Sequence, residues 1–293
     1  MQMHFKVCTV SEEKMLHETI ELPVNYRGKL ENNNFVPYIK TYILDNFEEF
    51  SEGRKRPLVL ICPGGAYEML STREGEAVAL KMNSLGFHAV TLWYSLKPME
   101  FPASLLDLCE AMNCVRSHAE EWNVDPDRII VAGFSAGGHL AASLGVYWNR
   151  ELLKEYIPYS KEVLKPNALL LSYPVITAGE FAHKGSIENV LGCTKKYSVK
   201  DVQLEELVTE NVPPVFMWHT YEDGCVPLEN SMLFAQACRK NNVPVEYHVF
   251  RRGGHGLSLA TKETTWNNGT NPAGIQKECQ IWPELFAAWM ETL

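Results

Sequence analysis

Residues 133–137 of the chain read Gly-Phe-Ser-Ala-Gly, a pattern that could hold a serine nucleophile. The apolar run Arg128–Ala132 before it favours a buried strand, and the segment 138–144 after it favours a helix. A G-x-S-x-G segment between a strand and a helix is typical of a nucleophile elbow, a turn so tight that its neighbours must be small. The pattern therefore predicts that Ser135 lies at the tip of such a turn with its hydroxyl exposed.

A serine hydroxyl needs a general base, and that base needs an acid to orient it. In this strand pattern the partners are expected in the order serine, acid, histidine, each directly after a strand. Asp223 follows an apolar run that ends at His219. His255 lies in a glycine-rich loop after a run that ends at Phe250. We therefore predict a catalytic triad of Ser135, Asp223 and His255.

Other residues compete for these roles. Glu222 is adjacent to Asp223, but the Asp-Gly pair at 223–224 suits a turn better, which favours Asp223 as the acid. His139 on the helix and His219 at a strand end are expected to be packed and hydrogen-bonded instead of catalytic. The predicted triad is favoured over these competitors because its three residues follow the expected order, each at the carboxyl end of a strand.

Acyl transfer also needs N–H donors for the oxyanion that forms on the substrate. The backbone N–H of Ala136, directly after the nucleophile, is expected to be one donor. The second is expected from the loop after the first central strand, where residues 63–67 read Pro-Gly-Gly-Ala-Tyr. Glycines in that loop let the backbone approach a substrate closely. This chemistry needs no metal and no organic cofactor, and we predict none.

Strands that alternate with helices predict an α/β fold with a mostly parallel central sheet and helices on both faces. An N-terminal strand at Phe5–Val10 is expected to pair antiparallel with the next one. Ser71–Glu74 has the form of a capping box, which predicts a helix from there to about Leu85. The other expected strands are 38–44, 57–62, 88–94, 128–132, 168–173, 215–219 and 245–250, and the clearest helices are 102–118, 229–241 and one beginning near 282.

The 293 residues contain no internal repeat and no linker, so we predict one domain over 1–293. The largest departure from the strand–helix rhythm is 175–212, which is expected to be a small insertion, either a cover over the site or surface packing. Tyr67 and Trp266 are candidates for shaping the substrate pocket, with Tyr67 as a candidate substrate-binding residue.

The composition of the chain limits the classes of partner that the protein is expected to bind. The formal net charge is −9 and no basic stripe with interleaved aromatics is present, which argues against nucleic acid. No segment approaches the ~20 apolar residues of a membrane span, and the N-terminus lacks an apolar signal region. The eight cysteines show no C-x-x-C spacing, which fits free thiols in a reducing cytoplasm. We therefore predict a cytoplasmic protein without membrane association, and a homo-oligomer is left open.

Together these segments resemble the α/β-hydrolase superfamily, and within it the carbohydrate-esterase branch of acetyl esterases and acetylxylan esterases. The resemblance runs from about Pro57 to the C-terminus. Related lipases and esterases carry His-Gly-Gly-Gly where this chain reads Pro-Gly-Gly-Ala at 63–66, so the resemblance does not fix which amide points inward. Its most specific segments are 63–67, 127–143, 213–230 and 243–260.

The resemblance implies an α/β-hydrolase fold and a serine carboxylic ester hydrolase. The expected substrate is a small-molecule ester, foremost an acetylated sugar, cleaved through an acyl-enzyme. The implied roles are nucleophile for Ser135, acid for Asp223 and base for His255. The implied oxyanion donors are Gly65, Ala66 and Ala136.

Two other classes of function fit the same residues. An amidase, peptidase or arylformamidase would use the same triad on a different leaving group, because fold and triad alone do not separate these activities. No added propeller or large N-terminal domain is present to admit peptides selectively, which counts against a peptidase. A non-catalytic binding protein on a hydrolase scaffold is disfavoured because a decayed site usually lacks a triad member, and here none is missing.

Overall fold

The computed structural model describes residues 15–24, 26, 30, 35–47, 49, 53–193, 196–266 and 271–293. The strands are β1 (Thr19–Glu21), β2 (Tyr38–Tyr42), β3 (Arg56–Cys62), β4 (His88–Trp93), β5 (Val124–Phe134), β6 (Ala168–Ser172), β7 (Val215–Thr220) and β8 (Val245–Phe250). They form an eight-stranded sheet in the order β1-β2-β4-β3-β5-β6-β7-β8. β1 and β2 pair antiparallel, as do β2 and β4, whereas every other neighbouring pair is parallel.

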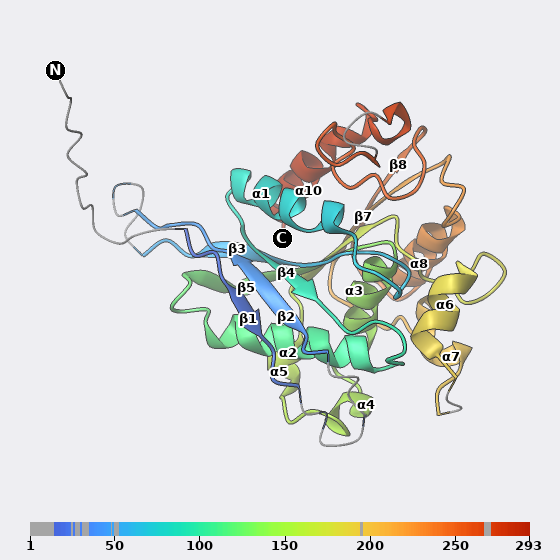
Figure 1. Cartoon of the computed structure of the whole chain (residues 1–293), viewed down its shortest axis with the longest axis horizontal. Helices are drawn as coiled ribbons and strands as arrows, with labels where there is room; N and C mark the ends of the chain where they lie inside the picture. Colours follow the sequence, from blue (N-terminus) through green and yellow to red (C-terminus); the bar gives the residue numbers. More distant parts are fainter. Residues whose placement is uncertain are drawn as a thin grey trace.

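Helices cover both faces of this sheet (Figure 1). One face carries α1 and α10, and the other carries α2, α3 and α8. The predicted α/β class, with a mostly parallel sheet between two helical layers, is confirmed. The α-helices are α1 (Glu76–Ser84), α2 (Ala103–Ser117), α3 (Ala136–Tyr147), α4 (Glu151–Lys154), α5 (Lys161–Leu164), α6 (Lys184–Leu191), α7 (Val199–Val202), α8 (Glu229–Lys240) and α10 (Trp282–Met290).

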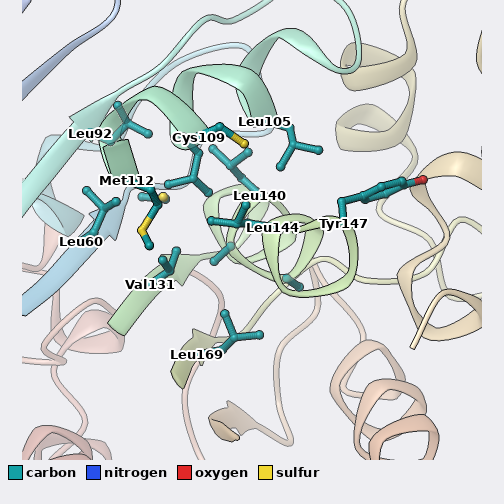
Figure 2. Close-up of a cluster of buried hydrophobic side chains, with 14 of the residues drawn as sticks. Leu60, Leu92, Leu105, Cys109, Met112, Val131, Leu140, Leu144, Tyr147 and Leu169 are labelled. Carbon is teal, nitrogen blue, oxygen red and sulfur yellow. The ribbon is translucent and has the colours of Figure 1, made fainter. Parts of the chain in front are cut away.

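The central strands are apolar throughout because both of their faces are buried. On β3, Leu58 and Leu60 belong to the cluster beneath α2 and α3, whereas Val59 and Ile61 belong to the cluster beneath α1 and α10. Alternate side chains of a strand point to opposite faces, so a continuous apolar run supplies two cores at once. In Figure 2 the strand residues Leu60, Leu92, Val131 and Leu169 face the α2 residues Leu105, Cys109 and Met112 and the α3 residues Leu140 and Leu144.

Most of the predicted elements are confirmed, but the capping box is wrong. Ser71 makes no side-chain cap, and a short 3-10 turn, η2 (Thr72–Glu74), precedes α1. Glu74 is only 2% exposed and hydrogen-bonds elsewhere, as described below, so it does not serve as a helix cap. The strand predicted at Phe5–Val10 lies outside the described residues.

The segment 175–212 holds α6, α7 and the 3-10 turn η3 (Leu204–Glu206). Its start is tied to α8, because Asn230 Oδ1 accepts the N–H groups of Ile176 at 2.9 Å and of Thr177 at 3.1 Å. Among the residues that the structure describes, no helix combines the length and apolar character that a bilayer span requires.

Candidate active site

Ser135 occupies a strained turn between β5 and α3. Its φ of 54° and ψ of −119° lie outside the regions that L-residues ordinarily adopt. The backbone passes so close that a Cβ atom on Gly133 would lie 2.0 Å from Gly137 O, and one on Gly137 would lie 2.1 Å from Cys62 O. Glycine is therefore required at both positions. Non-glycine residues with such strain cluster at functional sites, where the surrounding structure holds them in place.

Ser135, His255 and Asp223 lie in one hydrogen-bonded chain. Ser135 Oγ is 2.7 Å from His255 Nε2, and His255 Nδ1 is 2.7 Å from Asp223 Oδ2. The three residues come from the loops after β5, β8 and β7, whose carboxyl ends meet at one edge of the sheet. The order and spacing match the geometry in which a histidine takes the serine proton and a carboxylate orients the histidine.

Asp223 is held as a carboxylate by several donors. Its Oδ1 accepts the N–H groups of Cys225 at 2.9 Å and of Val226 at 3.0 Å. Burial raises the pKa of Asp223, but hydrogen bonds and charge from His219 and His255 outweigh it and leave the pKa well below its usual range. The side chain therefore stays ionised throughout the neutral range.

His219 is buried, as predicted, and it also contacts the candidate acid. Its Nδ1 lies 2.7 Å from Ser231 Oγ, and its Nε2 lies 3.2 Å from Asp223 Oδ2. No sequence pattern indicates this contact, because it is the turn after β7 that brings the two side chains together. The competing carboxylate, Glu222, is exposed, and its Oε2 accepts the N–H of Gly253 at 3.4 Å.

The loop after β3 is shaped to present N–H groups. Gly65 has a φ of 132° and Ala66 a φ of 57°, so the backbone turns sharply beside Ser135. Within the described part of the chain, the N–H groups of Gly65, Ala66 and Ala136 donate to no protein acceptor. The N–H of Gly64 is already taken, by Glu74 Oε2 at 2.8 Å. Gly65, Ala66 and Ala136 thus have the free amides that an oxyanion would need.

Glu74 joins this loop to the loop that carries His255. Its other oxygen, Oε1, accepts the Tyr173 hydroxyl at 2.8 Å, and that hydroxyl in turn accepts the N–H of Ser258 at 2.8 Å. The Tyr173 ring packs edge-on against His255, with centroids 5.1 Å apart. Sequence reasoning missed this network because the spacing of Ser71 and Glu74 imitates a capping box, and only burial of the carboxylate reveals its partners.

Replacing Glu74 with alanine is expected to lower the free energy of unfolding by about 2–4 kcal/mol, because it leaves two buried donors, the Gly64 N–H and the Tyr173 O–H, without an acceptor. Urea unfolding of Glu74→Ala and of the exposed control Glu121→Ala measures the effect. Equal unfolding midpoints for the two variants would show that the network contributes nothing to stability.

A cavity of about 840 Å³ opens at Ser135. Its wall includes Gly65, Ala66 and His255, together with residues that the sequence analysis did not assign to the site. Trp266, which was a candidate for shaping the pocket, does line this cavity. The Arg73 guanidinium lies 4.5 Å from the centre of the Trp266 ring. The unassigned wall residues are Glu68, Met69, Ser71, Thr72, Arg73, Glu74, His183, Cys225 and Gly256.

Tyr67 does not reach this cavity. Its side chain is 2% exposed, and its hydroxyl lies 2.8 Å from His139 Nδ1. His139 Nε2 lies 2.9 Å from the carbonyl of Val202, so this histidine is packed and hydrogen-bonded as predicted. The pair ties the loop after β3 to α3 and to the 175–212 segment. Tyr67 therefore packs against α3 and is not among the residues that line this cavity.

The buried His139 is expected to make the protein sensitive to acid. Burial lowers its pKa from 6.5 to about 4, so between these values the unfolded chain binds the proton and the folded chain does not. The free energy of unfolding should therefore fall by roughly 2 kcal/mol more in the wild type than in His139→Gln between pH 7 and pH 5. Urea titrations at both pH values test this, and parallel losses in the two proteins would refute it.

No group of three or more histidine, cysteine or acidic side chains within the described ranges is arranged to hold a metal ion. The cysteines of the described part are free thiols, at positions 62, 109, 114, 193, 225, 238 and 279.

The chain is similar to proteins of known activity. The family model BD-FAE matches residues 44–238. Endo-1,4-beta-xylanase B of Butyrivibrio fibrisolvens is 35% identical over 80% of this chain, and an acetylxylan esterase of Xylanibacter ruminicola is 30% identical over 68%. The crystal structure of an acetyl ester-xyloside bifunctional hydrolase from Caldicellulosiruptor lactoaceticus superimposes with a TM-score of 0.78 at 36% identity, covering 94% of this chain and 96% of that one.

The two curated relatives are much longer than the matched region. The match spans 37% of the xylanase and 40% of the acetylxylan esterase.

Proposed function

Since the chain belongs to the BD-FAE family and has the α/β-hydrolase fold, we propose that it is a serine carboxylic ester hydrolase that removes small acyl groups from carbohydrates or small esters. One observation carries the proposal. Ser135, His255 and Asp223 are joined by two 2.7 Å contacts, and Ser135 and His255 line a cavity, which is the arrangement that acyl transfer requires.

In the proposed reaction, Ser135 Oγ attacks the ester carbonyl while His255 Nε2 takes its proton. Asp223 keeps the imidazole oriented and stabilises the imidazolium that forms. The carbonyl oxygen becomes negative and is stabilised by the N–H of Ala136 and by an N–H of Gly65 or Ala66.

The tetrahedral intermediate then collapses. His255 gives its proton to the departing alcohol oxygen, which leaves Ser135 as the acyl-enzyme. A water molecule, deprotonated by His255, attacks the acyl-enzyme and forms a second tetrahedral intermediate. The carboxylic acid leaves, and the proton on His255 returns to Ser135.

We propose acetyl as the acyl group and a xylo-oligosaccharide as the alcohol. The support is the similarity to an acetylxylan esterase and to an acetyl ester-xyloside hydrolase. The test is a panel that holds acetylated xylo-oligosaccharide, p-nitrophenyl esters of increasing acyl length, an aryl-formamide and an aminoacyl-arylamide. Acetate release from the sugar, faster than cleavage of either amide, is the expected result. Preferred cleavage of the formamide or arylamide would replace the proposal with an amidase or arylformamidase activity.

A cytoplasmic location is part of the same proposal, together with the absence of membrane or nucleic-acid partners. Its support is the free cysteines of the described residues and the formal net charge of −9. Cell fractionation tests the location, and sedimentation measures whether a homo-oligomer forms.

A further inference from the structure

His183 stands in the cavity wall without a role in the acyl-transfer steps. It precedes α6, in the 175–212 segment, and lines the same cavity as Ser135, His255 and Cys225. Within the described part of the chain its Nδ1 has partners in Ser186, whereas its Nε2 has none. Since His183 lines this cavity and its Nε2 has no protein partner among the described residues, that atom is available to bind a molecule in the cavity.

The protonation of the His183 ring is fixed by its neighbours. Nδ1 caps α6 by accepting the backbone N–H of Ser186 at 3.3 Å, and the Ser186 hydroxyl lies 2.8 Å from the same atom. A backbone N–H can only donate, so Nδ1 carries no proton. In the neutral ring the proton is therefore on Nε2. Burial and the charge of His255 lower the pKa of His183, which keeps the ring neutral near pH 7.

The segment that carries His183 is held in place on both sides. Asn230 Nδ2 donates to the carbonyl of Phe181 at 2.9 Å, two residues before the histidine. At the far end of α6, Asn189 Nδ2 donates to the carbonyl of Ala66 at 2.8 Å. The helix thus runs from the start of α8 to the oxyanion loop. A donor on such a support loses little freedom when it binds, which favours specific recognition.

The chemistry of the reaction defines what lies near this donor. His255 must protonate the departing alcohol oxygen, so the alcohol part of the ester lies on the His255 side of Ser135. His183 and His255 line the same cavity, and the backbone just before His183 is hydrogen-bonded to Asn230, on the helix that follows the loop of Asp223. A sugar presents hydroxyl oxygens there, whereas a simple aryl ester presents none.

We propose that His183 is a substrate-positioning residue, whose Nε2–H donates a hydrogen bond to a hydroxyl of the sugar that bears the ester. This inference rests on the proposed esterase activity. It adds that part of the 175–212 segment recognises a polyhydroxylated leaving group.

Two substitutions separate donation from helix capping. His183→Asn keeps an acceptor at the position of Nδ1 and removes the distant donor. His183→Gln places an amide N–H near the position of Nε2 and gives up the cap. The matched control is His118→Asn, at a half-buried histidine outside the cavity wall. Each protein is assayed with acetylated xylo-oligosaccharide and with p-nitrophenyl acetate, and the ratio of the two kcat/KM values is the readout.

The ratio is expected to fall about 5-fold in His183→Asn, the loss typical of one neutral hydrogen bond, mainly through a higher KM for the sugar ester. His183→Gln should keep more than half of the wild-type ratio, and His118→Asn should keep all of it. A wild-type ratio in His183→Asn, or a larger fall in His183→Gln than in His183→Asn, would overturn the inference. Absence of ester hydrolysis in the wild type would instead overturn the proposed function itself.

Discussion

Replacing Ser135 with alanine is expected to lower kcat for p-nitrophenyl acetate by a factor on the order of 10⁵ or more, while the fold persists. The substitution removes the oxygen that becomes acylated in the proposed mechanism, and it leaves Cβ and the turn in place. His255 then lacks its 2.7 Å partner, but its side chain is 19% exposed at the cavity, so water can replace the lost contact. Initial rates, together with circular dichroism and a urea unfolding curve, separate lost chemistry from lost structure.

The matched control is Ser71→Ala, which removes another hydroxyl from the wall of the same cavity. It should change kcat far less than Ser135→Ala does. Activity in Ser135→Ala that is comparable to the control would mean that another group is the nucleophile.

Asp223→Asn is the second large effect that we expect, a loss in kcat of about 10⁴-fold, as in other serine hydrolases that lose this carboxylate. An amide at this position can donate to His255 Nδ1, which favours the ring tautomer whose Nε2–H faces Ser135 and cannot take its proton. The imidazolium would also lose the adjacent negative charge. The low pKa of Asp223 keeps the wild-type residue ionised, so the wild type should lose no activity through its protonation above about pH 4.

Glu222→Gln is the control for this experiment, because Glu222 is the neighbouring carboxylate and is exposed. It should stay within about 2-fold of the wild type, the scale of an ordinary surface substitution. If Glu222→Gln lost activity and Asp223→Asn retained it, the acid would have to be reassigned.

The sequence was sufficient to predict the sheet and the positions of its carboxyl ends. Runs such as Leu58–Cys62 and Ala168–Leu171 are apolar at every position, which only a strand buried on both faces requires. Glycine at 133 and 137 marks the elbow because backbone atoms occupy the space that a side chain would need. The α/β-hydrolase resemblance was likewise confirmed, whereas the single domain, the triad roles and the oxyanion donors stay predictions.

What the sequence could not predict depends on contacts between distant segments. Glu74 is hydrogen-bonded to Tyr173, which lies 99 positions away in the sequence. No local sequence pattern indicates that this carboxylate is buried. Tyr67 was expected near the substrate, yet packing against α3 turns its hydroxyl to His139. No sequence pattern indicated a role for His183. The role proposed for it depends on which ring nitrogen carries the proton, and this follows from the cap that the side chain makes to α6.

The central claim is that Ser135 is the nucleophile, and the most direct test is to locate the covalent adduct of a fluorophosphonate probe by mass spectrometry. We expect one adduct per chain, on the peptide that holds Ser135, with none in Ser135→Ala and much slower labelling in His255→Ala. An actively hydrolysing protein that takes no label, or takes it at another residue such as the exposed Cys225, would contradict it.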